Sequence, residues 1–120
     1  MIRKIRPGQF ETEVKNSQQP VLLEFYASWC PRCAMMEDVV EEFASENRGG
    51  IKVCQIDEAD AVLLMEQYGI DRVPSFLAFI KGKVTGAVTG VVSREVLERL
   101  FYRKDAVLFS TDLNKKRGCR

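Results

Sequence analysis

The spacing of apolar residues changes along the first half of the chain. Residues 21–27, VLLEFYA, are almost continuously apolar, which predicts a central strand buried on both faces, although Glu24 interrupts it. From Pro31, apolar residues recur at three- and four-residue intervals until Gly49 and Gly50, which predicts a long amphipathic helix. The apolar stripe of this helix consists of Met36, Val39, Val40 and Phe43.

A shorter helix is predicted before the central strand. In residues 7–17, Pro7 suits the first helical position, and Phe10 and Val14 lie four residues apart on an inner face. Residues 2–5 allow a short strand ahead of this helix.

The second half of the chain continues the alternation between strands and helices. Residues 51–57 predict a strand with Val53 and Gln55 on one face and Cys54 on the other, followed by a helical stripe that stops at Gly69. Two further strands flank the turn KGK as a hairpin, and Ser93 suits the N-cap of a last helix. This order predicts an α/β fold with a mixed central sheet and helices on both faces.

Length and charge narrow the classes of protein. A chain of 120 residues suits one domain, assigned to residues 1–104, with a C-terminal extension at residues 105–120 that has no settled pattern. A net charge of +1 argues against nucleic acid or a membrane surface as the main partner. The N-terminus lacks the apolar core of a secretory signal, so we expect a cytoplasmic protein, and a monomer.

Two of the four cysteines form the motif C-P-R-C at residues 30–33. Cys30 falls where the central strand ends and the long helix begins, so the unpaired N–H groups of the helix start favour its thiolate form. Arg32 adds a nearby cation, and Pro31 costs the helix no hydrogen bond at its first position. The sequence has no histidine, so a proton acceptor must be another residue type.

Cys33 lies one helical turn further and shares the inner stripe, so we expect it to be the more buried thiol. An exposed sulfur that attacks a disulfide and a shielded one that resolves the mixed disulfide are what thiol–disulfide exchange requires. A lone C-x-x-C supplies only two of about four zinc ligands, and a disulfide across so short a loop constrains the unfolded chain little. We therefore predict a reactive dithiol and no metal.

The chain has W-C-x-x-C at residues 29–33, VPSF at residues 73–76 and the pair Thr89-Gly90. The resemblance of these motifs to those of the thioredoxin family covers about residues 7–101. It implies a thioredoxin fold and a dithiol–disulfide oxidoreductase that reduces protein disulfides, with no bound cofactor and with a thioredoxin-reductase-like electron donor.

The resemblance also assigns residues around the dithiol. Pro74 would be a cis-proline facing the cysteines, and the Val73 backbone would pair with an extended substrate segment. Trp29, Val73 and Gly90 would form an apolar platform. Arg32 and Arg72 at its rim would favour acidic partners.

Glu24 is the unexpected residue of the central strand. Burial raises the pKa of a carboxyl group, which suits a residue that accepts the proton of Cys33. The family has a buried Asp at the matching position, and Val53 replaces a Lys that usually neighbours it, so we expect the pKa of Glu24 to be raised further. The alternative is a glutamate at a strand end that reaches solvent.

Two departures from the family pattern have consequences. Pro-Arg between the cysteines, in place of the usual Gly-Pro, leaves the redox potential unassigned. Asp38 stands where the family usually has a kinking proline, so we predict a straighter dithiol helix with its backbone hydrogen bond restored at that residue.

Other interpretations stay open at this point. A glutaredoxin-like enzyme would use glutathione, and a thioredoxin-fold adaptor would use the dithiol only to sense redox state or to control binding of a partner. Cys54 is most simply a small buried hydrophobic residue. Cys119 lies among Lys115, Lys116 and Arg117, which favours a reactive thiolate, and the alternative is an inert tail.

Overall fold

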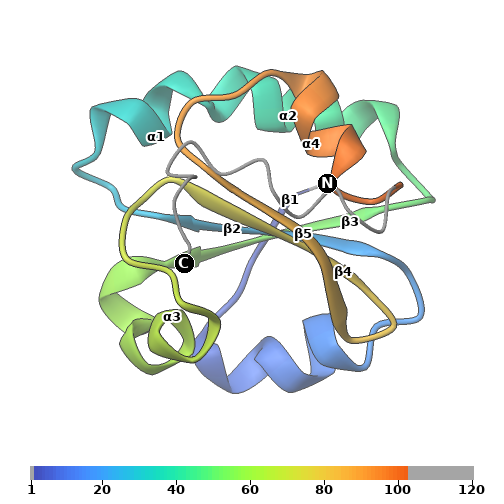
Figure 1. Cartoon of the computed structure of the whole chain (residues 1–120), viewed down its shortest axis with the longest axis horizontal. Coiled ribbons are helices and arrows are strands. Elements are labelled where there is room, and N and C mark those ends of the chain that lie inside the picture. Colours follow the sequence, from blue (N-terminus) through green and yellow to red (C-terminus); the bar gives the residue numbers. More distant parts are fainter. Residues whose placement is uncertain (1, 103–120) are drawn as a thin grey trace.

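The strand predicted at residues 21–27 lies at the centre of the molecule. In the computed structural model, which describes residues 2–102, β2 (Val21–Tyr26) is the middle strand of a five-stranded sheet with the order β1-β3-β2-β4-β5 (Figure 1). Strands β1, β3 and β2 are parallel, whereas β4 and β5 run antiparallel as a hairpin. The other strands are β1 (Ile2–Lys4), β3 (Lys52–Asp57), β4 (Ser75–Ile80) and β5 (Lys83–Thr89).

Helices cover both faces of this sheet, as predicted. Helices α1 (Pro31–Met35), α2 (Glu37–Glu46) and α4 (Arg94–Arg99) lie on one side, and α3 (Val62–Tyr68) lies on the other with the N-terminal helical segment (Figure 1). Alternate side chains of β2 therefore enter two separate cores. Leu22 packs in the core beneath α2 and α4, and Leu23 in the core shared with Phe10 and Val14.

The dithiol helix, predicted as one long helix from Pro31 until Gly49 and Gly50, divides at Met36. The Met36 N–H bonds to the Cys33 carbonyl oxygen, three residues back, at 3.0 Å instead of continuing the four-residue ladder. The Met36 side chain is fully buried, and its Sδ accepts a hydrogen bond from the Val92 N–H at 3.4 Å. The break therefore coincides with long-range packing of Met36. The helix divides here even though this chain has Asp38 in place of the proline that is usual in the family.

The N-terminal segment is helical as predicted, but its two turns are first tighter and then wider than those of an α-helix. It consists of a 3₁₀ turn, η1 (Pro7–Gln9), and a π-helical turn, η2 (Glu11–Lys15). The Asn16 N–H bonds to the carbonyl oxygen of residue 11 at 2.9 Å, five residues back. Phe10 and Val14 are buried as expected.

The predicted ends of several elements are confirmed. Gly69 ends α3 with a φ of 71°, in the left-handed region that glycine adopts without a Cβ penalty. Ser93 caps α4 by accepting a hydrogen bond from the Val96 N–H at 3.3 Å. One element was not predicted, a 3₁₀ turn η3 (Glu58–Asp60) between β3 and α3.

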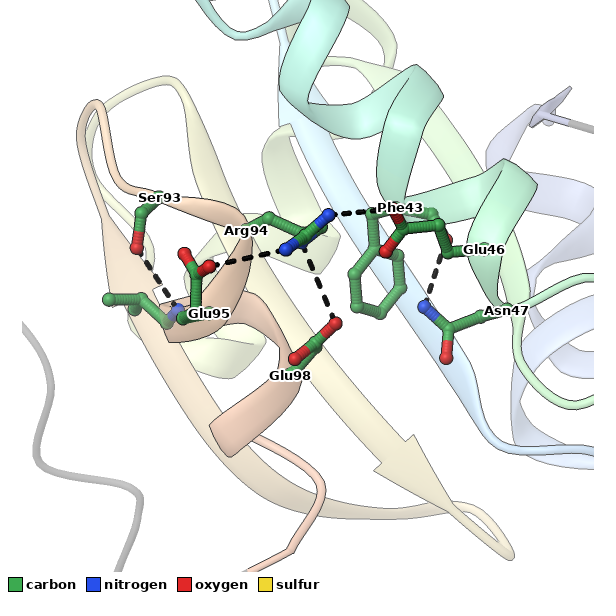
Figure 2. Close-up of polar contacts among 8 residues, drawn as sticks. Phe43, Glu46, Asn47, Ser93, Arg94, Glu95 and Glu98 are labelled. Carbon is green, nitrogen blue, oxygen red and sulfur yellow. Dashed lines mark hydrogen bonds and ion pairs between the residues drawn. The ribbon is translucent and has the colours of Figure 1, made fainter.

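A cluster of ion pairs joins α4 to α2 (Figure 2). Arg94 contacts Glu46 of α2 at 2.6 Å and, on its own helix, Glu95 at 3.2 Å and Glu98 at 3.8 Å. The α2 end is itself capped, since the Asn47 amide donates to the Phe43 carbonyl oxygen at 2.9 Å (Figure 2). A single exposed ion pair contributes little to stability. This network, however, joins the end of α2 to the start of α4, and both helices pack on the same core.

Gly86 allows β5 to approach the end of α4. A Cβ built at this residue would lie 2.7 Å from the Leu100 carbonyl oxygen and 2.8 Å from the Leu100 Cα. Neighbouring Thr85 donates a hydrogen bond to the same carbonyl oxygen at 2.8 Å, so the two backbones are held together.

Replacing Gly86 by alanine should lower the free energy of unfolding by about 1–3 kcal/mol, because a well-packed core tolerates added volume poorly. Urea unfolding of Gly86→Ala beside Gly8→Ala measures this effect, since a Cβ at Gly8 would have no described atom within 4 Å. Equal free energies of unfolding for the two variants would show that the backbones at Gly86 and Leu100 can move apart without loss of stability.

Candidate active site

The two cysteines of the C-P-R-C motif lie at the start of α1. Cys30 is the N-cap, with φ −93° and ψ 113°, and Pro31 occupies the first helical position as predicted. The Cys30 Sγ accepts a hydrogen bond from the Cys33 N–H at 3.1 Å and lies 3.9 Å from the Val73 carbonyl oxygen. A backbone N–H directed at the sulfur stabilises a thiolate more than a thiol.

Both sulfurs are free thiols, and their burial corrects one expectation. Each cysteine is 7% exposed, so Cys33 is not the more buried residue. The two differ instead in the openings that they line: Cys30 borders an outer groove and an inner cavity, and Cys33 borders only the inner cavity. Burial, and then the adjacent Cys30 sulfur, raise the pKa of Cys33 to about 12.

The outer groove, of about 540 Å³, brings together residues predicted to bind substrate. Trp29 is 70% exposed beside the cysteine, which is unusual for so large an apolar side chain and suits a contact surface. The residues lining the groove are Trp29, Cys30, Pro31, Arg32, Glu58, Asp71, Arg72 and Val73.

Pro74 and Gly90 are not among the residues that line this groove, although Pro74 directly follows the lining residue Val73. The Val73–Pro74 peptide bond is cis, as the resemblance implied, and the Gly90 N–H bonds to the Pro74 carbonyl oxygen at 2.8 Å. The Ser75 hydroxyl donates to the Arg72 carbonyl oxygen at 2.7 Å and lies 3.0 Å from the Thr89 hydroxyl. These bonds hold the Val73 carbonyl opposite Cys30.

The charges around the groove are more balanced than the sequence suggested. The Arg72 Nε bonds to Asp71 Oδ1 at 3.2 Å, and Glu58 lines the same groove. Two carboxylates therefore accompany Arg32 and Arg72, so the rim of the groove is not purely cationic, and the preference for acidic partners stays a prediction.

Glu24 lies beneath the dithiol rather than at the surface. Its side chain projects from β2 and the residue is only 2% exposed, so the alternative of a glutamate that reaches solvent is wrong. Burial is the largest influence and raises the pKa of Glu24 from 4.5 to about 7. A hydrogen bond from Gln55 and the positive charge of Lys4 lower this pKa, whereas the negative charge of Glu37 raises it.

The inner cavity connects Glu24 with both cysteines. It has a volume of about 740 Å³, lies between the sheet and the α1–α2 helices, and opens to solvent past the exposed residues Lys4, Glu37 and Glu41. Sequence reasoning missed Lys4, Gln55 and Glu37 as members of this site. Alternation along residues 51–57 had already placed Gln55 on the Val53 face, and this was the available signal. The polar and sulfur-bearing residues lining the cavity are Lys4, Glu24, Ser28, Cys30, Cys33, Glu37, Asp38, Glu41 and Gln55.

Other parts of the chain add little to the site. Cys54 is completely buried in the opposite core, and burial raises its pKa to about 11, which fits a small hydrophobic residue. Cys119 and the extension at residues 105–120 lie outside the described residues. Among residues 2–102, no three His, Cys, Asp or Glu side chains gather as metal ligands. No helix in this range is long and apolar enough to cross a membrane.

Comparison with known proteins agrees with the geometry. Residues 1–102 match the sequence profile of the Thioredoxin family. The chain is 34% identical to a thioredoxin of Pyropia yezoensis over 96 residues, which is 80% of this chain and 90% of that protein. It is 33% identical to Thioredoxin 1 of Nostoc sp. over 80% of this chain and 90% of that protein. It is also 40% identical to the chloroplastic Thioredoxin M3 of Oryza sativa subsp. japonica, over 69% of this chain and 47% of that protein.

These sequence similarities agree with three features of the structure: the mixed five-stranded sheet, the C-x-x-C dithiol at a helix start, and the buried carboxylate beneath it. The chain therefore belongs to the thioredoxin family and is a thiol–disulfide oxidoreductase.

Proposed function

We propose that the protein reduces protein disulfides, with Cys30 as nucleophile, Cys33 as resolving thiol and Glu24 as the proton-transfer group. The observation that carries this assignment is the division of the site into two openings. Cys30 borders the outer groove, where a substrate can approach, whereas Cys33 and Glu24 share the inner cavity.

The reaction proceeds by two exchanges. The Cys30 thiolate attacks one sulfur of the substrate disulfide, which breaks that bond, forms a mixed disulfide and releases the other substrate sulfur as a thiolate that is then protonated. Cys33 then transfers its proton to the Glu24 carboxylate, directly or through water, and attacks the Cys30 sulfur. The second substrate sulfur leaves as a thiolate. The substrate disulfide has then gained two electrons, which Cys30 and Cys33 supplied by forming a disulfide with each other.

Geometry also supports how a substrate is held. An extended segment that pairs with the Val73 backbone would bring its sulfur to Cys30, because the Val73 carbonyl oxygen lies 3.9 Å from the thiol. The exposed Trp29 ring adds an apolar contact surface beside Cys30, and the Gly90 N–H bonds to the carbonyl oxygen of the cis-proline. The mixed charges of the groove suit substrates that present both acidic and basic residues beside their disulfide.

The remaining parts of the proposal concern the cellular setting. The dithiol itself is the redox centre without a bound cofactor, and a thioredoxin-reductase-like protein re-reduces the monomeric enzyme. A reducing compartment suits reactive cysteines. The sequence indicated the cytoplasm, and the relatives named chloroplastic add the plastid as a compartment for this proposal.

Replacing Cys33 by serine should trap the mixed disulfide. Cys30 still attacks a disulfide-bonded test protein, but the serine hydroxyl cannot resolve the intermediate, so a covalent complex of one enzyme and one substrate chain accumulates. Non-reducing electrophoresis and mass spectrometry measure this adduct.

The matched variants separate the alternatives. A Cys30→Ser, Cys33→Ser double variant should form no adduct. Wild-type protein should accelerate reduction of the same substrate by dithiothreitol without glutathione. Absence of both the adduct and the acceleration would contradict the proposed reductase.

A further inference from the structure

A row of polar side chains crosses three parallel strands beneath the dithiol. Lys4 of β1 is the Cα partner of Gln55 in β3, and Gln55 is the partner of Glu24 in β2. Side chains at paired positions project from the same face of a sheet, so all three point towards the inner cavity that they line. In the next two strands the row continues with buried Phe76 and Val88.

Direct contacts join the members of this row. The Gln55 Nε2 donates a hydrogen bond to Glu24 Oε1 at 2.7 Å, at the short end of the range for a nitrogen donor. The Lys4 ammonium lies 5.2 Å from the centre of the Tyr26 ring, another residue lining the cavity. Gln55 thus fixes one oxygen of the Glu24 carboxylate, and Glu24 itself is only 2% exposed to solvent.

Resting on the proposed role of Glu24, we propose that Gln55 is a positioning residue that holds the Glu24 carboxylate in its ionised, proton-accepting form, with Lys4 as its electrostatic support. A carboxamide suits this role because it donates hydrogen bonds without titrating. Because the Gln55 carboxamide does not take up a proton, the proton of Cys33 passes to Glu24.

The charges around Glu24 explain why such support is needed. Burial disfavours the carboxylate, and Glu37 of α2 adds a repelling negative charge. Asp38 and Glu41, also of α2, line the same cavity, as do the two thiols. Lys4 and the Gln55 amide oppose these effects and keep the pKa of Glu24 near 7.

Replacing Gln55 by methionine should shift the pH dependence of the resolution step. Methionine has a similar length but no donor, and loss of a hydrogen bond to a charged group corresponds to about one pKa unit. The midpoint for attack of Cys33 on the mixed disulfide should rise by about one pH unit. The rate at pH 7 should therefore fall about fivefold, while the rate at pH 9 stays at the wild-type value.

Single-turnover release of substrate from a preformed mixed disulfide, measured from pH 5 to pH 9, provides the profile. NMR titration of the Glu24 carboxyl carbon provides an independent midpoint. Lys4→Met should move both midpoints upward by about half a pH unit. Arg3→Met is the matched control, because Arg3 is on the same strand but pairs with Glu13, on the opposite face, and it should move neither.

The outcomes separate this inference from the proposed function. If Glu24→Gln keeps the wild-type profile, Glu24 does not transfer the proton and the proposed function fails at that residue. If Glu24→Gln removes the inflection but Gln55→Met leaves both midpoints in place, the inference alone is overturned. A rate loss for Gln55→Met that is equal at all pH values would indicate a structural defect and would also overturn it.

Discussion

Replacing Cys30 by serine is expected to reduce turnover with a disulfide-bonded protein by at least about a thousandfold. A serine hydroxyl is not ionised near neutral pH and cannot form a disulfide, so the first exchange step is lost. The hydrogen bond from the Cys33 N–H at 3.1 Å can still be accepted by an oxygen, so the fold should be retained. Reduction of the test protein by dithiothreitol, followed by turbidity or by free thiols, measures the loss.

Cys54 offers the control for this experiment. It is completely buried in the core on the other side of the sheet, so Cys54→Ala should keep wild-type turnover although it removes a thiol. Alkylation of the reduced wild-type protein at pH 7 should label Cys30 and leave Cys54 unmodified. Turnover by Cys30→Ser at the wild-type rate would contradict its assignment as nucleophile.

Replacing Glu24 by glutamine should stabilise the protein at alkaline pH. The pKa of Glu24 is raised from 4.5 to about 7 in the folded chain, so the folded state keeps a proton that the unfolded state has already lost between these values. Stability of the wild type therefore falls as the pH rises through this window, by about 3 kcal/mol in total. Glutamine carries no charge and should add about that much to the free energy of unfolding at pH 8.5.

Urea unfolding from pH 4 to pH 9 checks both the size and the sign of this effect. At pH 4 the glutamate is largely protonated in both states, so wild type and Glu24→Gln should differ little. Glu66→Gln is a suitable control, because Glu66 is exposed on α3 and should leave the pH dependence unchanged. A free energy difference that stays constant across the pH range would show that Glu24 does not titrate abnormally in the folded chain.

Much of the site was predictable from local patterns. The continuous apolar run around Glu24 indicated a strand buried on both faces, so burial of its carboxyl group followed from sequence. The position of Cys30 between that strand and a helix beginning at Pro31 likewise predicted an N-cap cysteine. These predictions succeeded because they depend on residues close together in the chain.

Predictions that needed distant contacts were less successful. Met36 interrupts the dithiol helix where it packs against Val92, a residue far along the chain. The charges of Arg32 and Arg72 were evident in the sequence, but the compensation by Glu58 depends on the turn that follows β3. Relative burial of the two thiols also depends on Val73, next to the cis-proline, which packs against the cluster of Ala27 and the two cysteines.

The amino-acid sequence by itself determined the order of helices and strands, the dithiol and the presence of a carboxylate in the central strand, because periodicity and helix-end chemistry act over a few residues. The tertiary structure decided which side chains surround that carboxylate. Pairing of β1 and β3 with β2 places Lys4 and Gln55 beside Glu24. Strand register is set by the packing of whole faces, so no short segment of this chain contains that information.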